Sequence, residues 1–453
     1  MTAGKPGRRE RTALWQARFA CLSAFGPYLV AGTRTEQVVV FALAIWTLIT
    51  GWPHLMRGHT GLLPVMALWL GLIAVTLIGT CWRPLEIGAY GAQPVSHGLA
   101  ALLLPLALMI LVWSWSVHVP PARLALMASR IIITGMCLNT AISVAQTVTR
   151  NPQVIGILPR FWDAPGSNGS VALNAATNWR FTGIFNQPAE AGTAYALALC
   201  CLIYLAQIRV VRAKTTAAAF LVLAAGGVLT GSKVFLVGAI PIALLMMLRD
   251  RRSRARVLAS GVCAASALWL AGVSGVAPAW AGGTGLSQLL HPSIAIWTSG
   301  RYGTGATLGP VVMDVLRSSP WYGFGAGGLA VAYDSLWAEV LIYAGVTGVI
   351  ITALTLAVLA TRCLHLRGHL HDAERRLACA ALAVAVGASL GIPSLTANRA
   401  SVLLWLTFGP LLATVPRFGW SAAPGLREQA EARNGADVTG GWRPDLPLVV
   451  RGG

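Results

Sequence analysis

Apolar runs of about 20 residues recur along this chain, and they restrict its fold more than any other feature. A run of that length spans the hydrocarbon layer of a bilayer as a helix. Only helices and closed barrels satisfy every backbone polar group in lipid, and barrel strands alternate apolar and polar residues, whereas these runs are continuous. Charged residues make up 11% of the 453 residues, against about 25% in a soluble domain. The sequence therefore predicts an all-α fold, a polytopic membrane helix bundle.

We expect about twelve transmembrane helices, each one an apolar run of spanning length. The predicted spans are 13–32, 37–53, 61–82, 97–118, 124–146, 184–208, 215–231, 234–248, 257–275, 333–361, 377–395 and 399–416. They belong to a single transmembrane domain over residues 1–416, with two long loops at about 147–183 and 276–332. Residues 417–453 are polar and mixed in charge, and we expect a disordered tail there.

The positive residues indicate which side of the membrane is cytoplasmic. The net charge of +19 arises mostly in short loops and near the termini, which is the positive-inside pattern, so no nucleic-acid partner is expected. Basic stretches at 209–214, 249–256 and 362–376 fall on one side by the parity of the spans, together with both termini. We therefore expect both termini to be cytoplasmic and the two long loops to be extracytoplasmic.

Few carboxylates lie inside the predicted spans, and they are Glu190, Asp334 and Glu339. An ionised group in lipid costs roughly 2.5–3.5 kcal/mol, so such groups usually face a cavity or a partner. At a helix rise of about 1.5 Å per residue, Asp334 and Glu339 lie roughly 42 and 35 Å from Arg362. If Arg362 marks the cytoplasmic surface, Asp334 reaches the outer headgroups of a bilayer about 40–45 Å thick. One such carboxyl alone can simply join two helices, but three near outer ends favour a functional site.

Among the cations expected on the outer side, where the positive-inside rule makes them unusual, the candidates for binding an anion are Arg180, Arg301 and Lys233. A guanidinium binds phosphate through two hydrogen bonds and stays charged at every relevant pH. The sequence therefore predicts a cationic clamp for a phosphate or diphosphate. Taken singly, Lys233 is better explained by an ammonium group that reaches the lipid headgroups.

No metal and no cofactor are predicted. The side chains of His365, His369 and His371 have near-metal spacing, but they lack a supporting carboxylate or cysteine. The glycine-rich stretch 323–328 has no preceding strand and no following GK[ST], so it does not indicate a nucleotide site. We expect it instead to bring its loop close to the mouth of the long helix predicted at 333–361.

Three blocks of the sequence resemble a known family. They are Arg180-Phe-Thr-Gly183 through Pro188 and Gly192, then Ser299-Gly-Arg301 with Pro320-Trp-Tyr-Gly-Phe-Gly325, then Asp334-Ser335 followed after nine residues by Gly345-Val-Thr-Gly348. With the span topology and the two long loops, the chain resembles the O-antigen ligase and O-antigen polymerase superfamily of bacterial envelope glycosyltransferases, whose fold is GT-C-like.

The resemblance implies an inverting, metal-independent glycosyltransferase of the bacterial plasma membrane. Its donor would be an oligosaccharide linked to a polyprenyl diphosphate such as undecaprenyl diphosphate, and its acceptor a hydroxyl of a glycan or glycolipid. Arg180 and Arg301 match the arginines that engage the diphosphate in the family, and Asp334 stands where the family has its catalytic histidine. An aspartate, with an ordinary pKa of about 3.9 against 6.5, needs a special environment to act as a base. Glu190 and Glu339 would be substitute bases or orienting partners.

Several functions stay open at this point. A polymerase of envelope polysaccharide or exopolysaccharide is favoured, and an O-antigen-type ligase differs from it only in the acceptor. A transporter of a glycolipid or anionic solute would need similar cations, but midplane sites and repeat symmetry are typical of transporters and are not evident in the sequence. A non-catalytic membrane scaffold is the remaining interpretation.

Overall fold

The computed structural model describes residues 7–29, 33–57, 60–82, 91, 93–162, 170–248, 308–329, 335–366, 372–396 and 399–413. Within these residues the regular secondary structure is helical, apart from one isolated bridge between Tyr28 and Arg34. The span predicted at 257–275 and the tail predicted at 417–453 lie outside the described residues.

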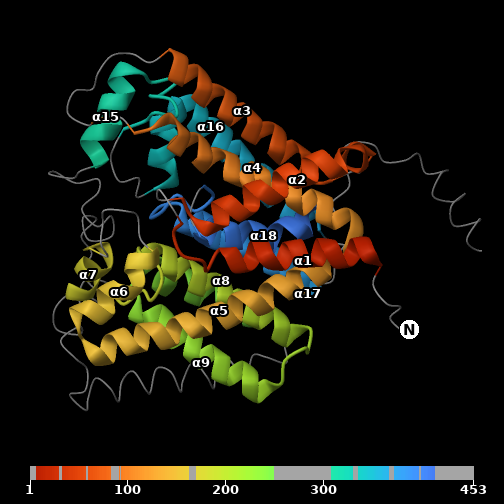
Figure 1. The fold of residues 1–453 in the computed structure, drawn as a ribbon, viewed down its shortest axis with the longest axis vertical. Coiled ribbons are helices and arrows are strands. Elements are labelled where there is room, and N and C mark those ends of the chain that lie inside the picture. The colour runs from red at the N-terminus through yellow and green to blue at the C-terminus, as the bar shows by residue number, and fades with distance from the viewer. Residues whose placement is uncertain are drawn as a thin grey trace, which may run out of the picture. The chain divides into compact units, whose positions relative to one another are not determined.

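Helices overlap all the other predicted spans, although the span predicted at 13–32 is helical only as far as Ser23 (Figure 1). The described residues also form helices in the regions predicted as long loops. They are α1 (Arg8–Ser23), α2 (Thr35–Arg57), α3 (Leu63–Cys81), α4 (Val95–His118), α5 (Pro121–Thr149), α6 (Pro152–Trp162), α7 (Ser170–Thr177), α8 (Pro188–Gln207), α9 (Ala213–Leu229), the π-helix η2 (Val234–Ala239), α10 (Ile240–Leu248), α15 (Leu308–Ser318), α16 (Leu336–His365), α17 (Asp372–Ala388) and α18 (Arg399–Ala413). Proline begins α5, α6 and α8, because its fixed φ suits the first helical position and its missing N–H costs nothing there.

Five of these helices are long and apolar enough to cross a membrane, namely α3, α4, α5, α8 and α16. In its described residues the chain is therefore an all-helical, multi-pass membrane protein. Shorter apolar helices are α9, α18, part of α2 and the stretch formed by η2 and α10. The total of about twelve spans stays a prediction.

Helix α8 lies at the centre of the bundle, packed against α5, α9, α17 and η2. Every residue from Glu190 to Leu205 is buried. Small residues allow the close approach that membrane helices favour. A Cβ added at Gly192 would lie 2.4 Å from the Cβ of Ser232, which precedes η2. The turn before η2 is therefore pressed against the first turns of α8.

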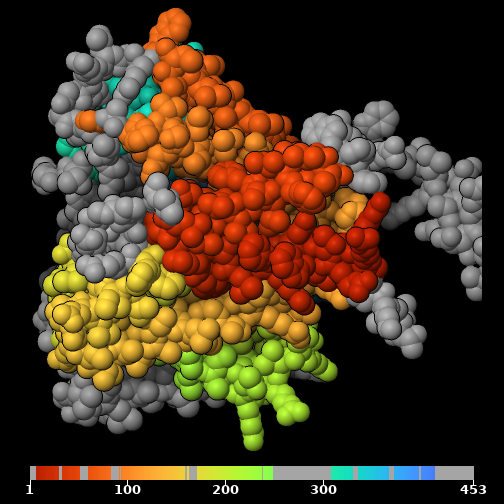
Figure 2. Space-filling view, in the orientation of Figure 1, coloured from red at the N-terminus to blue at the C-terminus, as the bar shows by residue number. Residues whose placement is uncertain are grey.

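Helix α18 is also enclosed, and all of its residues are buried. It packs against α4, α5, α8 and α17. On the face shown in Figure 2, α1 and α2 cover α18. Charged groups at the start of α18 are consequently removed from water and from lipid, and the protein itself must supply their partners.

Helix α16 is interrupted at Gly345, whose φ of 63° and ψ of −159° are not helical. The glycine-rich loop fills the interruption. The N–H groups of Phe324 and Gly325 donate to the carbonyls of Ile342 at 2.6 Å and Tyr343 at 3.0 Å. The backbone groups freed by the break are thereby satisfied inside the protein, as a membrane segment requires. The expected approach of stretch 323–328 to this helix is confirmed, but it occurs within the helix and not at its mouth.

This interruption corrects the depth estimate made from the sequence. That estimate counted an unbroken helix from Asp334 to Arg362 and placed Arg362 at the membrane surface. In the structure α16 changes direction at Gly345, and Arg362 is only 2% exposed. The depths of Asp334 and Glu339 therefore do not follow from counting helix rise.

The first long loop, expected at 147–183, contains more regular structure than the sequence suggested. It holds the end of α5 and the short helices α6 and α7, which contact each other. The indole N–H of Trp162, the last residue of α6, donates to the carbonyl of Phe25 at 2.8 Å. These helices lie at the end of the bundle away from the N-terminus (Figure 1). In the second loop, α15 and the glycine-rich segment are described, whereas 276–307 lies outside the described residues.

Candidate functional site

Charged side chains gather where α2, α8, α16 and α18 begin, which is the expected outer end of the bundle. We call Arg34, Glu36, Glu190, Glu339 and Arg399 the outer cluster. The exposed fractions are 0% for Glu36, 4% for Glu190 and Glu339, and 1% for Arg399, while the Arg34 side chain is 22% exposed. Buried charges are tolerated only when paired and hydrogen-bonded, so the contacts of each member indicate its role.

Arg399 joins three segments that are distant in sequence. Its guanidinium donates to the carbonyls of Trp162 at 3.0 Å, Ile184 at 3.4 Å and Gly26 at 3.5 Å. Its Cζ atom also lies 5.3 Å from the centre of the Tyr28 ring, a cation–π distance. One arginine thereby fixes the turn after α1, the end of α6 and the segment that leads into α8.

Glu190 and Glu339 both hold the start of α18. The Glu190 carboxylate accepts a hydrogen bond from the backbone N–H of Arg399 at 2.8 Å. The Glu339 carboxylate accepts one from the hydroxyl of Thr396 at 2.6 Å. A negative charge beside a helix N-terminus is favoured by the helix dipole. The two carboxylates therefore join α8 and α16 to α18, and a catalytic role for either stays a prediction.

Arg34 and Glu36 form the second half of the outer cluster. The Arg34 Nη1 atom lies 3.8 Å from a Glu36 oxygen, and its Nε donates to the Tyr28 hydroxyl at 3.1 Å. Burial lowers the pKa of Arg34, but Tyr28, Glu36 and Glu190 together raise it above its ordinary value, so the guanidinium stays charged. Both Glu36 oxygens are buried and accept no hydrogen bond within the described part of the chain. Arg34 and Arg399 supply its electrostatic partners.

Arg180 and Lys233, two of the cations expected from the sequence, lie on neighbouring segments. The Arg180 Nη2 donates to the carbonyl of Gly231 at 3.2 Å. A Cβ at Gly231, whose φ is +57°, would lie 3.0 Å from the Arg180 Cγ atom. Arg180 therefore rests on the turn between α9 and η2, the turn that carries Lys233. Ser232 of the same turn packs against Gly192 of α8, two residues after Glu190.

A buried polar network on α5 fixes the segment between Arg180 and α8. The Asn139 amide donates to the Thr182 carbonyl at 3.2 Å and accepts from the Ile184 N–H at 2.8 Å. The Gln146 side chain accepts from the N–H of Gly183 at 3.1 Å. Gly183 has a φ of +65°, which favours glycine. The amide side chains of Asn139 and Gln146 thus set the position and the direction of the segment that follows Arg180.

Replacing Asn139 by Ala is expected to lower the free energy of unfolding by about 2 kcal/mol, because the Ile184 N–H and the Thr182 carbonyl lose a buried partner. Thermal unfolding of the purified protein in detergent measures the change. Asn178→Ala is the control, since Asn178 is exposed and its side chain donates to the Asn174 carbonyl in its own segment. Equal unfolding midpoints for the two variants would refute a supporting role for Asn139.

The predicted site residues fall into three pairs. The structure describes two of them at different places, and the third pair lies outside the described residues. Glu190 and Glu339 meet at the start of α18, and Arg180 lies on the turn of Lys233. Asp334 and Arg301 lie outside the described residues. Sequence reasoning missed three members of the outer cluster.

The missed members are Arg34, Glu36 and Arg399. A usable signal existed for the arginines, since both stand at expected outer ends of spans, where the positive-inside rule disfavours them. The positive-inside rule marks both arginines as it marks Arg180. Glu36 lay one residue outside the span predicted at 37–53 and so was not counted among the carboxylates in spans.

No model of a known protein family matches this chain, and no curated protein sequence matches it either. The glycines of the resembling blocks have structural roles of their own. Gly183 and Gly345 have positive φ, and Gly192 allows close packing on Ser232.

Proposed function

We propose that the chain is an inverting glycosyltransferase of the bacterial inner membrane that takes glycan from a polyprenyl-diphosphate-linked donor and acts as an envelope or exopolysaccharide polymerase. The observation that carries the proposal is the placement of Arg180 on the turn of Lys233, at the expected outer end of α8. Two cations on adjacent segments suit a diphosphate, and a guanidinium binds its oxygens through paired hydrogen bonds.

The proposed reaction is a single displacement. The acceptor hydroxyl oxygen attacks the anomeric carbon of the donor, and the bond from that carbon to the diphosphate oxygen breaks with its electron pair. Asp334 takes the hydroxyl proton, and polyprenyl diphosphate leaves. Arg180, Arg301 and Lys233 stabilise the negative charge that grows on the leaving group. Attack on the face opposite the leaving group inverts the configuration.

Glu190 and Glu339 are assigned an orienting role in this proposal. Their hydrogen bonds to Arg399 and Thr396 support that assignment, because both carboxylates already have partners at the start of α18. The Arg399 guanidinium in turn binds the Ile184 carbonyl, in the segment that carries Arg180. The outer cluster would thus position the diphosphate arginine without touching the substrate.

The interruption of α16 bears on the transport alternative. Interrupted helices such as α16 form the midplane sites of many transporters, where freed backbone groups bind ions or solute. Here the freed backbone groups of α16 are hydrogen-bonded to the chain's own loop. The N–H groups of Phe324 and Gly325 donate to two carbonyls of α16, and the Val346 N–H donates to the Pro320 carbonyl at 2.7 Å. The break supports no solute site, so we retain glycan transfer. A ligase would use the same donor with another acceptor.

Arg180→Ala is expected to lower glycan transfer about 100-fold, in the range found when a charge-stabilising donor is removed. The test is complementation of envelope polysaccharide synthesis, with polymer length read on gels and protein level by immunoblot. Asp334→Ala is the companion variant. Arg212→Ala is the control, because Arg212 is exposed in the loop between α8 and α9. Full-length polymer from both Arg180→Ala and Asp334→Ala at normal protein level would reject the mechanism.

A further inference from the structure

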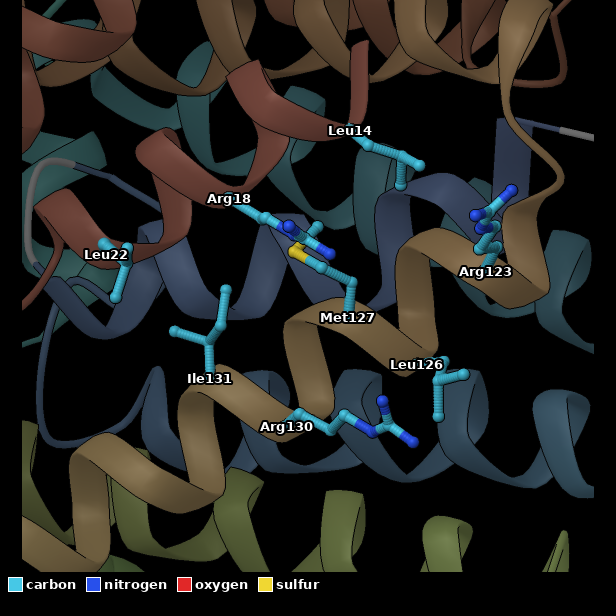
Figure 3. A pocket seen from close by; sticks show the side chains of 8 residues that line it. All are labelled: Leu14, Arg18, Leu22, Arg123, Leu126, Met127, Arg130 and Ile131. Atoms are coloured by element: carbon cyan, nitrogen blue, oxygen red, sulfur yellow. The ribbon is translucent and has the colours of Figure 1, made fainter. Parts of the chain in front are cut away.

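A groove runs between α1 and α5, on the part of α5 nearest its first residue (Figure 3). Its volume is about 430 Å³. Three arginines line it, Arg18 from α1 and Arg123 and Arg130 from α5, together with apolar side chains that include Leu22, Met127 and Ile131. In Figure 3 the Arg18 side chain extends from α1 toward Met127 of α5. The groove is thus lined by both cationic and apolar side chains.

The groove holds more positive than negative charge. Arg123 forms an ion pair with Glu10, the one carboxylate that the described residues bring to it. Arg18 and Arg130 are exposed, and among the described residues neither makes a hydrogen bond or an ion pair. Two guanidinium groups are therefore available to an anion from outside the protein.

The position of the Arg18 and Arg130 guanidinium groups favours an anionic lipid as their partner. Arg130 lies seven residues beyond Arg123, about 10 Å deeper along a helix long and apolar enough to span the membrane. A charge at that depth is costly unless an opposite charge accompanies it. Also on α1, Trp15 and Phe19 are 64% and 45% exposed, and their ring centres lie 5.5 Å apart in a stacked pair. Exposed aromatic residues of this kind are typical of the lipid interface.

We infer that the groove binds the phosphate headgroup of an anionic phospholipid, from the leaflet in which α1 and α5 begin. Arg18 and Arg130 contact the phosphate oxygens, Arg123 adds charge at the mouth, and an acyl chain lies along Leu22 and Ile131. Basic pockets between transmembrane helices bind anionic headgroups in this way. The inference is independent of glycan transfer, because no residue of the groove belongs to the outer cluster or to the diphosphate site.

The test uses the full-length protein in a non-ionic detergent, with native mass spectrometry of bound dioleoyl phosphatidylglycerol. The double variant Arg18→Gln with Arg130→Gln is expected to bind this lipid about 30-fold more weakly. Each single variant is expected to lose about fivefold, which decides the matter if the double variant is unstable. The control is Arg212→Gln with Lys214→Gln, which removes two exposed cations, one just before α9 and one in its first turn, and it should bind as the wild type does.

Two further probes identify the source of the phosphate. Dioleoyl phosphatidylcholine, which carries no net charge, should bind far more weakly than phosphatidylglycerol. Inorganic phosphate at the same concentration should not displace the phosphatidylglycerol. Equal binding by the wild type and the arginine variants, equal binding of the two lipids, or displacement by inorganic phosphate would each overturn the inference.

Discussion

Arg399→Ala is expected to lower the free energy of unfolding by about 3–5 kcal/mol, the cost of removing one partner from a buried charge network. Arg399 is 1% exposed, and its guanidinium binds the carbonyls of Trp162, Ile184 and Gly26. Alanine would leave these carbonyls without that donor. It would also remove one of the two arginines that act on the buried Glu36 carboxylate. The three segments that meet at the start of α18 would lose their common contact.

Two variants separate this effect from a general loss of charge. Arg399→Lys keeps the charge but cannot reach three carbonyls, so its stability should fall between those of the wild type and Arg399→Ala. Arg317→Ala removes an exposed arginine from α15 and should leave the stability unchanged. Thermal and denaturant unfolding in detergent measure all three. An unfolding midpoint of Arg399→Ala equal to that of Arg317→Ala would show that the outer cluster does not stabilise the fold.

Gly345→Ala is expected to cost about 3 kcal/mol or more, because two penalties combine at this position. The φ of 63° with a ψ of −159° belongs to a region that only glycine occupies readily. In addition, an added Cβ would lie 2.5 Å from the Pro320 carbonyl oxygen, so the loop in the interruption of α16 would have to move. Its hydrogen bonds from Phe324 and Gly325 would then be lost.

The chain offers a matched control for this substitution. Gly71 in α3 and Gly387 in α17 lie within helices, and a Cβ at either would meet nothing within 4 Å. Alanine there should be neutral or stabilising by up to about 1 kcal/mol, since it restricts the unfolded chain and favours helix. If Gly345→Ala unfolds at the same temperature as Gly71→Ala, the packing of the loop into α16 contributes nothing.

The helices themselves were predictable because a membrane span is a local signal. The runs at 97–118 and 184–208 correspond to α4, Val95–His118, and α8, Pro188–Gln207. Apolar length marks such elements without knowledge of their neighbours. Helices α6 and α7 were missed because they are short and lie in a polar region, where the same signal is absent.

The outer cluster was not predictable in the same way, because its contacts are tertiary. Glu190 and its donor Arg399 are 209 residues apart in sequence, and Glu339 and Thr396 are 57 apart. A sequence shows that a carboxylate lies in a span, but not which helix end meets it. The approach of the glycine-rich loop to α16 was expected from the sequence, but its insertion into an interruption at Gly345 was not, because that contact is also tertiary.

The most direct test of glycan transfer is a reaction of the purified full-length protein with a polyprenyl-diphosphate-linked oligosaccharide and no added nucleotide sugar. The account predicts a longer glycan with a new glycosidic bond of inverted configuration, together with release of polyprenyl diphosphate. Arg212→Ala should give the same products, and Arg180→Ala should give about 100-fold less. A donor that stays intact, or one that crosses the membrane of a reconstituted vesicle without a new bond, would contradict the account.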